Sequence, residues 1–151
     1  MAEENAERRI IDAWMKQYLD RTMEHPEDDL RTVVKGCHFT HFQAIGMQDI
    51  LARFVGRIEL FIAFLENDWK WKIDYDAAGG TIIANENKDF CVCPLVKTGL
   101  VASKELCACS EGFAEKMFSH VLGKEVRAEV IRSYLRDGKS CVYRITIPGG
   151  A

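Results

Sequence analysis

A change in the spacing of apolar residues at Trp69 constrains the fold more than any other feature of the sequence. From Trp69 to Asp76, aromatic or aliphatic residues alternate with charged ones. This alternation is typical of a β-strand with one buried face. Ala77–Gly80 supplies a turn, and Thr81 to Asn85 returns as a second strand. The sequence therefore predicts a β-hairpin over residues 69–85.

The chain before this hairpin has a helical pattern. Apolar residues spaced three and four apart predict a helix from about Glu4 to Met23, and a short second helix reaches about Val34. Asp49 is a suitable N-cap for a long helix that ends at Leu65. The residues that share one face of this first helix are Ile11, Trp14, Met15, Tyr18, Leu19 and Thr22.

The C-terminal part repeats the order of helix and then hairpin. Ser110 can cap a helix that Gly123 ends, and Val126–Tyr134 is expected to form a strand. Asp137–Gly138 indicates a tight turn, and apolar residues alternate along a last strand over Cys141–Ile147. Two such hairpins predict an α+β fold in which one antiparallel sheet packs against several helices.

The length of 151 residues fits a single domain spanning 1–151, whose two hairpins are joined through a cysteine-rich connection. Two consecutive apolar residues, Val130 and Ile131, interrupt the alternation of the third strand and predict a β-bulge. An exposed edge strand of such a sheet would also allow two copies of the chain to form a homodimer.

Charge and hydropathy restrict the classes of partner that we expect for this chain. The formal net charge is −3 without a basic run, so we expect no nucleic-acid partner. The longest apolar region, Ile50–Leu65, contains Arg53, Arg57 and Glu59, so we expect no membrane span. The first residues lack the pattern of a secretory signal, and a cytoplasmic location follows as the expectation. Thiols stay reduced in that compartment, which favours metal-binding or redox roles for paired cysteines.

Four of the six cysteines form two Cys-x-Cys pairs, Cys91 with Cys93 and Cys107 with Cys109. Four thiolates are a common structural zinc site, so zinc is the cofactor that these residues suggest. The spacing places both sulfurs of a pair along an extended strand, so a shared metal requires kinked loops. Two other interpretations stay open. A thiol near the start of the helix at Ser110 could be reactive, or all four could pack as small hydrophobic residues.

A second group of polar candidates lies among aromatic residues. Cys37, His38 and His41 could supply metal ligands or a general base, although burial of these histidines in the core is the more common outcome. The many large aromatic residues form part of the core or line an apolar pocket. The residues that we expect to line such a pocket are Cys37, His41, Phe54, Phe61, Cys141 and Tyr143.

The final third of the chain resembles the 4-vinyl reductase domain family, a related group of uncharacterised cysteine-rich bacterial proteins and the aminothiazoline-carboxylate hydrolase-like proteins. The resemblance lies in Cys107–Phe113, Leu122–Val126 and Ser133–Ile145. These segments combine a cysteine-marked helix start, a Leu-Gly stop, a strand, a glycine turn and a closing strand. The rest of the chain agrees only in the order of its elements.

The resemblance implies the ligand-binding fold shared with heme-NO-binding domains and a TRAPP vesicle-tethering subunit. In that group a cavity between helices and sheet holds a small apolar molecule, and a cysteine cluster is proposed to bind metal. Cys107, Cys109 and Cys141 match the cysteine positions of the family, whereas the Cys91 and Cys93 pair fits the uncharacterised group better. The chain has no clear axial histidine, so heme is not expected.

Two functions follow. The first is a small-molecule sensor or ligand carrier with an apolar pocket beside the cysteines. The alternative is a hydrolase acting on a small amide or thiazoline-like substrate, in which a thiolate of Cys107 or Cys109, or a metal-bound water, is the nucleophile. His38 or His41 would then carry the proton. A purely structural module, in which the cysteines pack or hold zinc, is the remaining interpretation.

Overall fold

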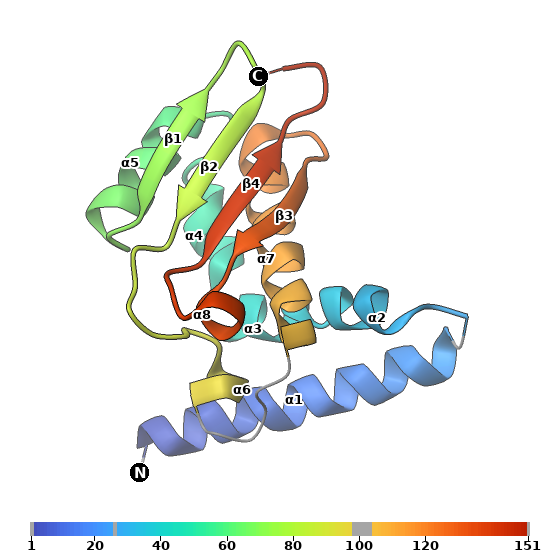
Figure 1. The fold of residues 1–151 in the computed structure, drawn as a ribbon. Coiled ribbons are helices and arrows are strands. Elements are labelled where there is room, and N and C mark those ends of the chain that lie inside the picture. Colours follow the sequence, from blue (N-terminus) through green and yellow to red (C-terminus); the bar gives the residue numbers. More distant parts are fainter. Residues whose placement is uncertain (1, 26, 98–103, 151) are drawn as a thin grey trace.

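A computed structural model describes residues 2–25, 27–97 and 104–150. Within them a four-stranded sheet packs against helices, as Figure 1 shows. The elements are α1 (Ala2–Glu24), α2 (Leu30–Gly36), α3 (His38–Ala44), α4 (Met47–Ala52), α5 (Ile58–Asn67), β1 (Lys72–Asp76), β2 (Thr81–Asn85), α6 (Pro94–Lys97), a 3-10 turn (Lys104–Leu106), α7 (Cys107–Leu122), β3 (Arg127–Arg132), α8 (Tyr134–Asp137) and β4 (Val142–Thr146).

The sheet is antiparallel throughout, with the strand order β1-β2-β4-β3. The two predicted hairpins are thus joined side by side through β2 and β4, where Ile82 lies opposite Ile145. The register between β3 and β4 shifts between Val130 and Arg132, which confirms the predicted bulge. The α+β prediction with an antiparallel sheet of two hairpins is confirmed at this level.

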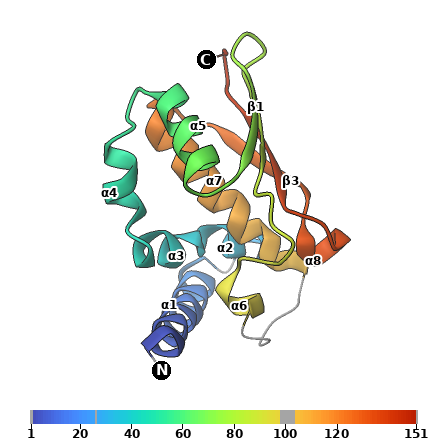
Figure 2. The same ribbon diagram turned by 90° about the vertical axis from the view of Figure 1, so that its left-hand side faces the viewer.

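Helices cover one face of the sheet (Figure 2), and α7 packs against β3 and β4. Ile82, Ala84 and Ile145 point from the sheet into the core against α7 and are buried. Their neighbours on the opposite face, such as Arg144 and Glu129, are exposed and pair with each other across two strands. Because side chains alternate between the faces of a strand, this polar face is the solvated one.

A second cluster of buried residues lies where α1 crosses the N-terminal ends of α6 and α7. The helix predicted over residues 4–23 is present as α1, and it contributes Ile11 and Trp14 to this cluster. Leu95 of α6 and Leu106, just before α7, meet them there. No helix of the described residues is long and apolar enough to cross a bilayer.

The prediction of one long helix from Asp49 to Leu65 is wrong. The chain forms two shorter helices, α4 and α5, with a break at Gly56. Gly56 has φ +73°, a left-handed conformation that ends a helix, and its N–H donates to the carbonyl of Val121 in α7 at 2.8 Å. The break lets α5 turn back along β1, a tertiary contact that the local apolar pattern does not encode.

Two boundaries in the C-terminal part also differ from the prediction. The helix predicted to begin at Ser110 begins at Cys107, so the second cysteine pair lies within its first turn. The third strand ends at Arg132 rather than Tyr134, because the Ser133 side chain caps the one-turn helix α8 by accepting from the Arg136 N–H at 3.0 Å. The tight turn expected at Asp137–Gly138 is the end of that helix.

Candidate functional site

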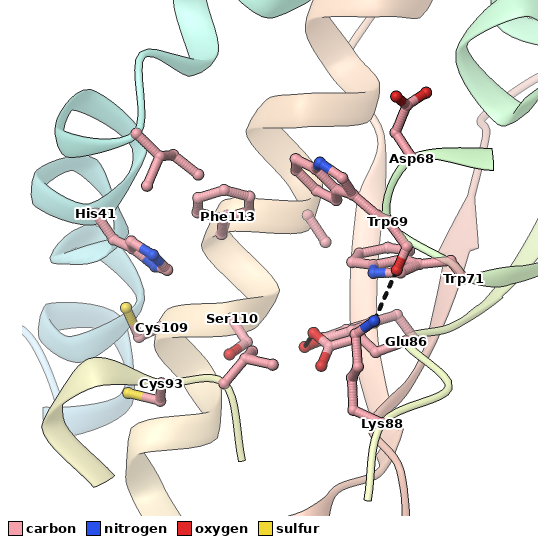
Figure 3. A pocket seen from close by; sticks show the side chains of 14 residues that line it. His41, Asp68, Trp69, Trp71, Glu86, Lys88, Cys93, Cys109, Ser110 and Phe113 are labelled. Atoms are coloured by element: carbon pink, nitrogen blue, oxygen red, sulfur yellow. Dashed lines mark hydrogen bonds between the residues drawn. The ribbon is translucent and has the colours of Figure 1, made fainter. Parts of the chain in front are cut away.

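A cavity of about 330 Å³ lies between α3, the N-terminal half of α7 and the end of the sheet. This volume is at the lower end of the range of small-molecule sites. Figure 3 shows the side chains that line it. They are His41, Ile45, Asp68, Trp69, Trp71, Glu86, Lys88, Val92, Cys93, Cys109, Ser110, Phe113, Ala114 and Tyr143.

The walls of the cavity are mainly aromatic. Trp69 and Trp71, which connect α5 to β1, have ring centroids 5.6 Å apart. Trp71 stacks on Tyr143 of β4 with a centroid distance of 6.2 Å and an interplanar angle of 17°. On the opposite wall, His41 of α3 lies 5.3 Å from the ring of Phe113 in α7. Because each ring is held by another ring, the cavity is preformed.

Among the described residues, Glu86 is the one acidic side chain that lines this cavity while being almost fully buried, with 5% of its surface exposed. Its backbone N–H donates to the carbonyl of Cys141 at 2.9 Å, which continues the β2–β4 pairing beyond Asn85. The Tyr143 hydroxyl donates to Glu86 Oε1 at 2.8 Å. The second carboxylate oxygen, Oε2, is buried and has no hydrogen-bond partner.

The electrostatics of this carboxyl group are dominated by burial. Loss of solvent raises the pKa of Glu86, while the hydrogen bond from Tyr143 and the charge of Lys88 act in the opposite direction and are weaker. Lys88 does not form an ion pair with the carboxylate, because its ammonium donates to the carbonyl of Trp69 at 2.8 Å. The site therefore holds an acid that lacks a counterion in contact with it.

Replacing Glu86 by glutamine is expected to stabilise the protein at neutral pH. The pKa of Glu86 is raised in the folded state, so its contribution to stability is present below its ordinary pKa of 4.5 and is lost as the pH rises through the folded value. The glutamine side chain does not ionise, so the variant does not lose stability as the pH rises. Its advantage should grow as the pH rises through the folded pKa of Glu86 and level off once that carboxyl group is fully ionised. Urea unfolding of both proteins between pH 4 and pH 8 measures it; parallel curves would contradict the prediction.

The two cysteine pairs lie in one neighbourhood. Cys91 and Cys93 lie just before α6. Cys107 and Cys109 lie in the first turn of α7. The charge of Cys107 contributes to raising the pKa of both Cys91 and Cys93, and that of Cys93 contributes to raising the pKa of Cys109. Cys93 and Cys109, one residue from each pair, also pack against the same buried cluster. All six cysteines are free thiols, so none of these neighbours forms a disulfide.

Burial keeps several of these thiols protonated. It raises the pKa of Cys109 and of Cys141 to about 12, and that of Cys37 to about 11. Cys109 lies in the first turn of α7, where the helix dipole alone would favour a thiolate. Desolvation exceeds that effect, so Cys109 is a thiol at neutral pH.

The predicted zinc site at Cys91, Cys93, Cys107 and Cys109 stays a prediction. In the part of the chain that the structure describes, no group of three or more His, Cys, Asp or Glu side chains is arranged to hold a metal ion. Metal analysis of the purified protein, with a count of free thiols, would test it.

The two candidate histidines are separated by the fold. His41 faces the cavity, and burial lowers its pKa. His38 faces α2 instead, where its Nδ1 lies 2.7 Å from the carbonyl oxygen of Lys35, and burial lowers its pKa as well. They therefore cannot act on the same ligand in this cavity.

Of the six residues expected to line a pocket, His41 and Tyr143 line this cavity. Cys37 is fully buried beside α1, and its thiol donates to the carbonyl of Val33 at 3.3 Å. Phe54 and Phe61 pack on each other, 5.5 Å apart, in the core under α5. Cys141 lies next to Glu86 and accepts the Tyr134 N–H at 3.4 Å.

Sequence reasoning missed Glu86, the polar residue at the centre of the site. A signal for it exists, because Ile82, Ala84 and Glu86 occupy alternate positions and the first two face the core. If the alternation of β2 is continued by one residue beyond Asn85, the carboxylate of Glu86 falls on the buried face of the sheet. Lys88 and Ser110, which also line the cavity, carry no comparable pattern.

No family model matches the sequence, and neither curated proteins nor solved structures include a significant match to it.

Proposed function

We propose that the protein is a small-molecule-binding domain, a sensor or ligand carrier, whose ligand occupies the aromatic cavity beside the cysteine cluster. One observation carries this proposal. Glu86 Oε2 is a buried oxygen without a partner, and it belongs to a side chain that lines an apolar cavity. Buried polar atoms in folded proteins nearly always have a partner, so a ligand that supplies one fits this site.

Two further features support the proposal. The cavity has rigid aromatic walls and a small number of polar groups, which is the usual composition of a ligand site. Its position between helices and sheet agrees with the resemblance to the 4-vinyl reductase domain family, for which a cavity at that place is implied. On the same ground we propose the fold shared by that group and the heme-NO-binding domains.

The hydrolase alternative has less physical support. Cys109 lines the cavity, but with a pKa raised to about 12 by burial it is a poor nucleophile at neutral pH. Of the two histidines predicted to carry the proton, only His41 lines the same cavity, and burial lowers its pKa. Zinc at the four cysteines is an additional prediction on which ligand binding does not depend.

Native mass spectrometry of freshly purified protein is expected to detect a retained small molecule that denaturation releases. Ala114→Leu should abolish the retention, because Ala114 is buried in the cavity wall and a larger side chain fills that space. Ala52→Leu makes the same chemical change on the exposed end of α4 and should leave the retention unchanged. Equal retention by both variants would reject this cavity as the binding site.

A further inference from the structure

The chemistry of the cavity restricts what it can hold. Glu86 contributes a carboxylate that is 5% exposed, with Oε1 bound by the Tyr143 hydroxyl and Oε2 free. Figure 3 shows both oxygens pointing across the cavity toward Ser110. An ionised carboxylate only accepts hydrogen bonds, so a ligand that meets Oε2 while Glu86 is ionised must either donate a hydrogen bond or carry a positive charge.

No cationic side chain of the described residues is in contact with this carboxylate. Lys88 lines the same cavity, but its ammonium is directed to the backbone carbonyl of Trp69 (Figure 3). Within residues 2–25, 27–97 and 104–150, no ion pair closer than 4.0 Å includes Glu86. A buried carboxylate without a counterion is costly, and a cationic ligand would remove that cost.

The aromatic walls also favour positive charge, whereas the ammonium of Lys88 in the same lining opposes it. Trp69, Trp71 and Phe113 present aromatic rings around the space that Glu86 faces (Figure 3), and Tyr143 lines the same cavity. The faces of such rings carry a partial negative charge and attract ammonium groups, tryptophan most strongly. An anionic ligand would meet Glu86 and these ring faces with the wrong sign.

We propose that the ligand is a compact organic cation, an ammonium group on an apolar body, held by Glu86 and the aromatic walls. This inference rests on the proposed ligand-binding function and specifies its ligand class. The ammonium donates to Glu86 Oε2, and the apolar body lies against Trp69, Trp71 and Phe113. The volume of about 330 Å³ limits the ligand to a small molecule, such as a phenyl ring with a short amine-bearing chain.

Three probes of similar size and different charge test this inference. They are 2-phenylethylammonium, the neutral 2-phenylethanol and the anion phenylacetate, each titrated into protein freed of retained molecules. Trp69 and Trp71 report binding by fluorescence, and Trp14, which lies beside α6 and α7, is replaced by phenylalanine to lower the background. We expect the ammonium to bind roughly 10- to 100-fold more tightly than the alcohol, the scale of a buried charge interaction.

Glu86→Gln should reduce the affinity for the ammonium by a similar factor and change that for the alcohol by less than about twofold. Glu129→Gln, the same change on the exposed face of the sheet, should alter neither. Equal binding of ammonium and alcohol, or an unchanged affinity for the ammonium in Glu86→Gln, would overturn the inference, as would failure of all three probes to bind. The proposed function is judged separately, by the retained molecule and the Ala114→Leu variant.

Discussion

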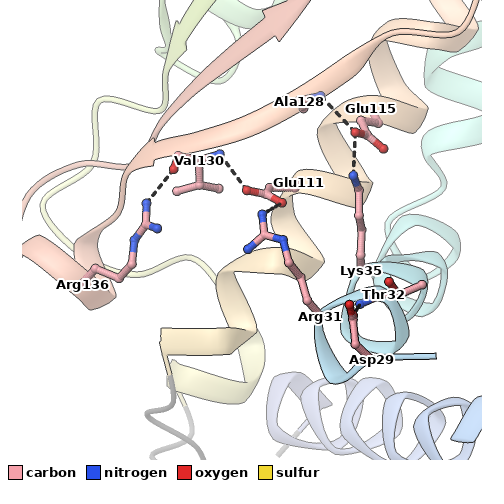
Figure 4. Close-up of polar contacts among 9 residues, drawn as sticks. All are labelled: Asp29, Arg31, Thr32, Lys35, Glu111, Glu115, Ala128, Val130 and Arg136. Carbon is pink, nitrogen blue, oxygen red and sulfur yellow. Dashed lines mark hydrogen bonds and ion pairs between the residues drawn. The ribbon is translucent and has the colours of Figure 1, made fainter. Parts of the chain in front are cut away.

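Replacing Glu111 by alanine is expected to destabilise the protein by about 2–4 kcal/mol, because it leaves a buried backbone donor unpaired and removes a charged acceptor. Glu111 of α7 is 3% exposed. Its Oε1 accepts the N–H of Val130 at 2.9 Å, and its Oε2 binds the guanidinium of Arg31 from α2. Figure 4 shows how this side chain links helix, strand and helix.

The position of Val130 explains why the effect should be large. It lies on β3, an edge strand that has no further strand beyond it in the sheet. Glu111 and, one turn later, Glu115 accept N–H groups of β3 at Val130 and Ala128, so α7 occupies the hydrogen-bonding edge of the sheet. The guanidinium of Arg136, in α8, donates to the carbonyl of the same residue, Val130. Without Glu111 the edge opens, and unpaired edges are prone to association.

Glu111→Gln is the matched control, since its amide oxygen can still accept from Val130. This variant loses the charge interaction with Arg31, a side chain that is 56% exposed, so the loss should stay below about 1 kcal/mol. Urea unfolding gives both free energies, and hydrogen exchange should show faster exchange of the Val130 amide in the alanine variant alone. If glutamine destabilised as much as alanine, the ion pair rather than the backbone hydrogen bond would hold β3.

The sheet could be predicted from the sequence because its signals are local and repeated. The first strand of the hairpin at 69–85 alternates apolar and charged residues, a turn follows it, and β2 has the predicted limits, Thr81–Asn85. The bulge was predicted from two adjacent apolar residues, Val130 and Ile131, at the point where the alternation of the third strand is interrupted. In each case the residues that decide the structure are neighbours in the chain.

The features that sequence reasoning missed depend on contacts between distant segments. The break at Gly56 is set by a hydrogen bond to Val121, and glycine alone within an apolar helical pattern does not require a break. Glu86 belongs to the site because Tyr143 and the two tryptophans from other elements surround it. The alternation of Ile82 and Ala84 indicates the buried face for Glu86, but it does not indicate which side chains of other elements lie beside it. The convergence of the cysteines could be anticipated, but their protonation depends on burial that only the fold supplies.

Replacing Gly112 by alanine should destabilise the protein, although the same change within a helix normally gains up to about 1 kcal/mol. Gly112 lies in the middle of α7 where that helix crosses α2 and α3. A Cβ atom there would overlap the carbonyl oxygen of Lys35 and lie 2.7 Å from His38 Nδ1. Those two atoms are hydrogen-bonded to each other, so neither can move aside freely. We expect a net loss of about 2 kcal/mol or more from this overpacking.

Gly36→Ala provides the matched comparison, because it lies at the end of α2, close to the same helix crossing. A Cβ atom at Gly36 would meet the guanidinium of Arg21, the end of a long and flexible side chain that can rotate away. This variant should therefore change the free energy of unfolding by less than about 0.5 kcal/mol. Urea unfolding of both variants measures the difference, and the His38 ring resonances should shift in Gly112→Ala alone. Similar stabilities would show that α7 does not approach α2 as closely as the packing of Gly112 against Lys35 requires.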